Sequence, residues 1–112
     1  MPTDFESLVS KVREVRTILL QAGQGVEFEA KRQIAALELT EKIVVFRELV
    51  IQGKFQVGPR ISEFFKTKNY YQFLEALEAY RSLGESESPT SSRRAEIKGR
   101  IVGFIEDFLL ST

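Results

Sequence analysis

The sequence contains no cysteine and no histidine, and its only aspartates are Asp4 and Asp107. Without cysteine there is no disulfide, no thiolate nucleophile and no cysteine-ligated zinc. Without histidine the imidazole general base, the usual hydrolase triads and most transition-metal sites are excluded. The aspartate-rich loops that bind calcium or magnesium and the glycine-rich loops that hold phosphates are missing as well. We therefore expect neither a metal nor a cofactor.

Long apolar runs and an excess of charge of one sign are also absent. No stretch approaches the roughly 18 apolar residues that cross a bilayer, and the first residues lack the basic and apolar regions of a signal peptide. The 112 residues carry 16 basic and 16 acidic side chains, so the net charge is zero. This balance gives no general attraction to nucleic acid or to an anionic membrane. We expect an intracellular, cytoplasmic protein without a transmembrane segment.

Glutamate is the main side chain left for acid–base chemistry. Glu38 and Glu41 are three residues apart, as are Glu75 and Glu78, and this spacing places each pair on one side of a helix. Such pairs usually belong to the solvated surface of a helix. The sequence therefore predicts no catalytic residue and a protein that is not an enzyme.

Apolar residues recur with the period of an α-helix over most of the chain. Steps of three and four separate them over about residues 4–21 and again over 27–52, where neither Pro nor Gly interrupts the segment. We predict that the longer segment is the central rod of the domain and that Phe46, midway along it, is among the most buried residues. This segment also carries a second apolar stripe, so it is expected to be packed on more than one side. The second stripe consists of Leu37, Val44 and Ile51.

Three further helices are expected in the second half of the chain. Pro59 is suited to the first turn of a short helix. The apolar pattern then changes phase, and Asn69 is the expected N-cap of a fourth helix that Gly84 ends. A polar loop over residues 85–92 separates it from a last helix that reaches about Leu110. The prediction is an all-α fold, a single domain of residues 1–112 arranged as an irregular antiparallel bundle of four to five helices.

The segment NYYQFLEALEAYRSL, residues 69–83, resembles the helix-turn-helix unit of tetratricopeptide repeats. It is also similar to the second helix of microtubule-interacting-and-trafficking domains, in which a third helix follows a polar loop. The second resemblance covers about residues 59–110 and implies a packed helical hairpin. Gly58-Pro59 makes the preceding helix shorter than the first helix of that family, and one hairpin cannot form a solenoid. No family is assigned.

Aromatic side chains line one face of the predicted fourth helix. Tyr70, Phe73, Leu77 and Tyr80 share this face, as core residues of a helix do. Tyr71 points away from its centre, and a displaced aromatic is a typical anchor for a partner. We therefore select Tyr71 as a candidate partner-binding residue.

The last predicted helix has a basic beginning. Cations near a helix N-terminus oppose the helix dipole, so their role is not to stabilise the helix. They can form ion pairs with glutamates of the preceding loop or helix, and the balanced charge favours this interpretation. They can also bind phosphates, an acidic partner or an anionic surface. These candidate anion-binding residues are Arg93, Arg94, Lys98 and Arg100.

Small residues form a stripe on the same helix. Ala95, Gly99 and Gly103 are spaced four apart, and Val102 and Leu110 flank them. Glycine inside a helix costs up to about 1 kcal/mol relative to alanine, so two of them suggest the close approach of a second helix. The alternative is an exposed face where small residues have no role. We predict packing against another helix, from a partner subunit rather than from the same chain.

These observations favour a non-enzymatic helical protein–protein interaction module, an adaptor or a subunit of a larger homo- or hetero-assembly. Its expected partner is another protein or a second copy of itself, bound through helix surfaces. The alternative is a regulatory module that binds nucleic acid or another polyanion through the basic start of the last helix.

Overall fold

The computed structural model describes residues 4–22, 25–84, 88 and 91–112, and within these ranges it contains helices and no strand. The predicted all-α bundle is confirmed. Most of the predicted loop over residues 85–92 lies outside the described residues. The helices are α1 (Asp4–Leu20), α2 (Val26–Ile51), α3 (Pro59–Lys66), α4 (Lys68–Leu83) and α5 (Ser92–Leu110).

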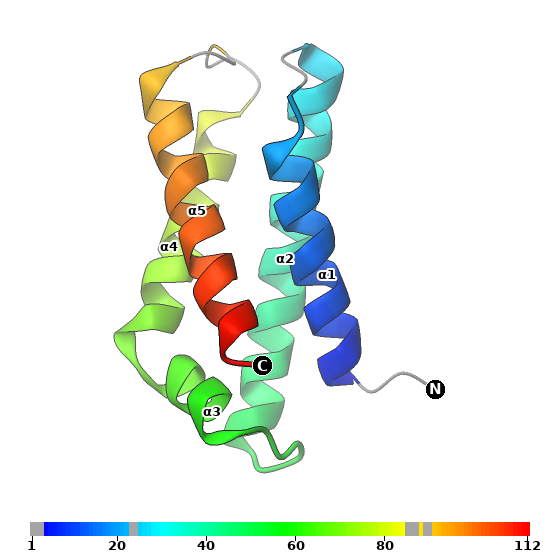
Figure 1. Cartoon of the computed structure of the whole chain (residues 1–112), viewed down its shortest axis with the longest axis vertical. Coiled ribbons are helices and arrows are strands. Elements are labelled where there is room, and N and C mark those ends of the chain that lie inside the picture. The colour runs from blue at the N-terminus through cyan, green and yellow to red at the C-terminus, as the bar shows by residue number, and fades with distance from the viewer. Residues whose placement is uncertain (1–3, 23–24, 85–87, 89–90) are drawn as a thin grey trace.

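Four of the helices run alternately up and down, and the short α3 lies across one end of them (Figure 1). Helix α2 packs against α1 and α4, and α5 packs against the same two helices from the other side. Helices α2 and α5 therefore occupy opposite corners of the bundle. The end of α1, the start of α2, the end of α4 and the start of α5 lie at the end of the bundle away from α3 (Figure 1).

The helix boundaries follow from local capping chemistry. Gly53 and Gly84 follow the ends of α2 and α4 with φ angles of 74° and 60°, a left-handed conformation that favours glycine. The predicted N-cap of α4 was wrong by two residues. Thr67, not Asn69, caps the helix, because its hydroxyl accepts a hydrogen bond of 3.4 Å from the backbone N–H of Asn69. Ser91 caps α5 in the same way, through the N–H of Arg94 at 3.1 Å.

One apolar stripe of α2 supplies the centre of the core. Its members are all buried: Ala36, Leu39, Ile43, Phe46 and Val50. The described helices of the chain leave the second stripe exposed, and its predicted packing stays a prediction for a partner. Leu37, Val44 and Ile51 are 37%, 38% and 48% exposed, because α1, α3 and α4 all lie against the other side of α2.

Aromatic rings fill the end of the bundle nearest α3. Phe46 belongs to this cluster, with ring centroids 5.6 Å from Phe5, 5.7 Å from Phe55 and 5.6 Å from Phe65. Phe46 is 2% exposed, so its predicted burial is confirmed. Tilted and stacked rings at these distances add to the stability gained from burial.

Phe46 and Val45 provide a matched pair of neighbours on α2. We expect Phe46→Ala to lower the free energy of unfolding by about 3–5 kcal/mol, because it leaves a cavity among three rings. Val45 is 61% exposed, so Val45→Ala should change the free energy of unfolding by less than about 0.5 kcal/mol. Urea unfolding followed by circular dichroism measures both values, and equal losses would show that the core side of α2 is misassigned.

Candidate functional site

Exposed aliphatic side chains gather on the outward side of α2. Of the ten large apolar side chains that are exposed among the described residues, seven belong to this helix. Five of them, which we call the α2 aliphatic face, are 37% to 61% exposed. They are Ile34, Leu37, Val44, Val45 and Ile51.

The period of the helix explains why this face is separate from the core. At about 100° per residue, Ile43 lies half a turn around the helix from Ile34, and it is fully buried while Ile34 is 56% exposed. Helix α2 is therefore apolar on two opposite sides, and its neighbours in the bundle cover only one of them. A helix that is apolar all round is normally buried all round.

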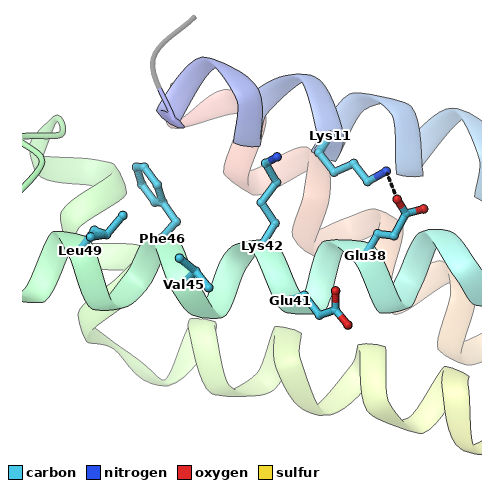
Figure 2. Close-up of a pocket in the computed structure, with 7 residues that line it drawn as sticks. All are labelled: Lys11, Glu38, Glu41, Lys42, Val45, Phe46 and Leu49. Carbon is cyan, nitrogen blue, oxygen red and sulfur yellow. Dashed lines mark hydrogen bonds and ion pairs between the residues drawn. The ribbon is translucent and has the colours of Figure 1, made fainter.

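A groove between α1 and α2 adjoins this face (Figure 2). Its volume is about 500 Å³, and Val45 belongs both to the groove and to the α2 aliphatic face. Phe46 and Leu49 complete its apolar part. Its remaining lining residues are Lys11, Glu38, Glu41 and Lys42.

An ion pair crosses the groove from α1 to α2. The ammonium of Lys11 lies 3.1 Å from Glu38 and 3.4 Å from Glu14. Burial opposes the charge on Lys11, but the hydrogen bond to Glu38 and the neighbouring carboxylates outweigh it and raise the pKa of this ammonium. Lys42 extends toward α1, whereas Glu41 points away from it (Figure 2). Neither of these two has an ion-pair partner among the described residues.

Tyr71 lies where α4 meets α2. Its side chain is 56% exposed, and its hydroxyl accepts a hydrogen bond of 2.8 Å from Nη2 of Arg47 on α2. The Arg47 guanidinium also stacks 5.2 Å from the Tyr71 ring and donates through Nε to the carbonyl of Phe65 at 3.2 Å. The structure therefore places Tyr71 on the surface, in a fixed position on the α4 side of α2.

Arg94 does not belong to an exposed basic patch, and its assignment as an anion-binding residue needs correction. It is 1% exposed, and its Nη1 lies 2.6 Å from Oε2 of Glu29 on α2. This acidic partner belongs neither to the preceding loop nor to α4. Arg93 and Arg100 are exposed and Lys98 is half-buried, so the polyanion alternative loses one of its four cations.

Glu29 is the centre of a buried ionic cluster at the end of the bundle away from α3. Its carboxylate accepts hydrogen bonds from Arg32 at 2.8 Å, from Arg94, and from the hydroxyl of Tyr80 at 2.9 Å. The two arginines extend the cluster to the connections: Arg32 donates to the carbonyl of Gln21, and Arg94 donates to those of Gly84 and Ser88. Sequence analysis missed this cluster, because Glu29 and Arg94 are 65 positions apart.

The cluster changes the acidity of Tyr80. Burial raises the pKa of its hydroxyl from 10.0 to about 12, and the hydrogen bond and charge of Glu29 act in the same direction. The positive charge of Arg94 opposes this shift. The described contacts of Glu29 and Tyr80 join α2, α4 and α5, so the cluster holds these three helices together.

The small-residue stripe of α5 faces away from the bundle. Ala95, Gly99, Gly103 and Leu110 are exposed, and Val102 is half-buried. A Cβ atom added at Gly99 or Gly103 would have no described atom within 4 Å apart from its chain neighbours and the backbone of its own helix. No described helix of the same chain approaches the two glycines, and packing against a partner there stays a prediction.

The acidic residues form no metal site in the part of the chain that the structure describes, where no three His, Cys, Asp or Glu side chains gather in a suitable group. None of the described helices is both long and apolar enough to span a membrane.

Removal of the charge at Glu29 tests the buried cluster. We expect Glu29→Gln to lower the free energy of unfolding by about 3–5 kcal/mol, because two arginines lose their buried counter-charge. Exposed Glu78, on α4, serves as the control, since Glu78→Gln removes the same charge from the surface. Thermal unfolding measures both, and equal stability of the two variants would contradict the central role of Glu29.

Tyr80→Phe should reveal the raised pKa of Tyr80. The tyrosine keeps its proton in the folded chain up to a pH of about 12, whereas it ionises near 10 when unfolded. The contribution of the Tyr80 hydroxyl to the free energy of unfolding is therefore complete below pH 10 and is lost as the pH rises through about 12. The difference in unfolding free energy between wild type and Tyr80→Phe should be constant up to pH 10 and then shrink. A difference that grows above pH 10 would contradict the direction of the shift.

Gly103→Ala and Gly84→Ala should have opposite effects. Position 103 is helical and open, so alanine should raise the free energy of unfolding by up to about 1 kcal/mol. Gly84 has a φ of 60°, where a Cβ is strained, so alanine should lower the free energy of unfolding there. Chemical unfolding of the dilute chain measures the stability of both variants. A loss of stability in Gly103→Ala would show that this face is already covered.

Comparison of this chain with protein-family models, with curated proteins and with solved structures gives no match.

Proposed function

We propose that the protein is a non-enzymatic helical interaction module, an adaptor or subunit whose α2 aliphatic face receives an amphipathic helix of a partner protein. The observation that carries the proposal is the row of five exposed aliphatic side chains along the longest helix. Burial of such side chains is the main favourable term in most protein association. Exposed apolar side chains that gather on one side of a helix often mark an interaction site.

The dimensions of the face suit a helix. It extends from Ile34 to Ile51, a distance of about 26 Å at 1.5 Å per residue. A partner helix of about five turns would match this length, and its ridges of side chains could pack between those of α2. Helix-in-groove recognition uses apolar anchors of the bound helix along one face. On α2, Leu37, Val44 and Ile51 follow one another at intervals of seven positions, about two turns each, so they can receive such anchors along the length of the face.

The surroundings of the face provide room for anchors. The groove beside Val45 could take an apolar side chain of the partner against Phe46 and Leu49. Tyr71, held by Arg47 on the α4 side of α2, could contact the opposite edge of the partner helix. Tyr71 thus keeps the partner-binding role predicted from the sequence, as a border residue of this surface.

Selection of helical peptides from a displayed library on the full chain tests the proposal. Peptides that bind should lose affinity about tenfold or more for the Val45→Asp variant, because a charge would enter the apolar contact. Leu110→Asp is the matched control, since Leu110 is 78% exposed on α5, far from this face. Fluorescence anisotropy measures both affinities.

The two variants separate the competing surfaces. Loss of binding in Leu110→Asp and full binding in Val45→Asp would move the site to the small-residue stripe of α5. A library that yields no binding peptide would contradict helix recognition altogether. Circular dichroism of both variants establishes that each remains folded.

A further inference from the structure

Two carboxylates lie within the α2 aliphatic face and restrict which partner helix can pack there. At about 100° per residue, Glu41 lies about 20° from Ile34 and 40° from Val45, and Glu48 lies 20° further from Ile34. Both side chains are exposed. They therefore stand among the aliphatic residues and not at the border of the face. A helix that packs there must meet both carboxylates.

The cations of the same chain leave these carboxylates poorly neutralised. Lys11 is paired with Glu38 and Glu14, and Lys42 extends toward α1, away from Glu41 (Figure 2). Arg47 lies 3.7 Å from Glu48, beyond hydrogen-bond distance, and its two closer contacts are with α4 and the carbonyl of Phe65. Glu41 has no ion-pair partner among the described residues.

Two simple arrangements of a second copy of α2 place no cation opposite Glu41 or Glu48. In a parallel pair, Glu41 would face Glu41 of the copy. In the antiparallel pair that sets Ile34 against Ile51, Glu41 would meet Val44 and Glu48 would meet Leu37. Either arrangement removes carboxylates from water without a cation, which is strongly unfavourable.

Resting on the proposed function, we infer that the partner is a basic amphipathic helix of another protein. It carries an aliphatic seam and, beside the seam, two Lys or Arg residues seven positions apart. This spacing matches Glu41 and Glu48, which are also seven apart and lie on the same side of α2. A partner cation beside a partly desolvated carboxylate contributes to specificity and to the rate of association.

Two synthetic helical peptides and the full chain test the inference. Both peptides carry the same leucine seam, and they differ only in having two Lys or two Glu residues seven positions apart beside it. Wild type should bind the Lys peptide about tenfold or more tightly than the Glu peptide, with a preference that falls as salt is added. The double variant Glu41→Lys/Glu48→Lys should reverse this preference.

A second double variant controls for net charge. Glu63 and Glu75 are exposed on α3 and α4, so Glu63→Lys/Glu75→Lys changes the net charge by the same amount away from the face. It should keep the wild-type preference for the Lys peptide. If it reverses the preference as well, the peptides sense only net charge and the inference fails.

The outcomes distinguish the inference from the proposed function. If Val45→Asp abolishes the binding of both peptides while the variant at Glu41 and Glu48 keeps the wild-type preference, helix docking stands and the basic partner is wrong. If wild type binds neither peptide and sediments as a dimer that Val45→Asp dissociates, the occupant is a second copy and the inference is overturned. Binding of neither peptide by a monomeric wild type overturns it too, and the library selection then decides the proposed function.

Discussion

Burial of one side of α2 against α1 and α4 is the interaction on which the rest of the structure depends. Ile43 and Phe46 lie at the centre of this side, and both are almost completely enclosed. Helix α5 packs against α1 and α4, and its Phe108 contacts Phe64 and Phe65 of α3 at the aromatic end. Since no neighbour in the bundle covers the outward side of α2, the packing that builds the fold also creates the aliphatic face.

Two different kinds of contact fix the two ends of α2. Rings around Phe46 close the end near α3 by non-directional apolar packing. The carboxylate of Glu29 closes the other end by directional hydrogen bonds to Arg32, Tyr80 and Arg94. Because these bonds leave little freedom of position, Glu29 fixes the register of α2 against α4 and α5. A helix held at both ends presents its outward side as a rigid surface, which lowers the entropy cost of binding.

The sequence predicted the helices well and the site poorly, for different physical reasons. Helical period and capping residues are local, so the bounds of all five helices were correct to within one or two residues, with Thr67 replacing Asn69 as the cap of α4. Which stripe of α2 is covered depends on how neighbours from distant parts of the chain pack, so the sequence alone did not show that Leu37, Val44 and Ile51 are exposed within the chain. Long-range polar contacts such as Glu29 with Arg94 have no local pattern at all.

In the free chain, the α2 aliphatic face opposite the core should be open to solvent. Methyl NMR with a soluble paramagnetic probe measures this exposure, because the relaxation of each methyl group reports its access to solvent. The methyl signals of Ile34, Val45 and Ile51 should relax strongly, while those of Ile43 and Ile101 should remain protected. If the methyl groups of Ile34 and Val45 are as protected in the free chain as those of Ile43 and Ile101, the face is already covered. This result would contradict its role as a docking surface.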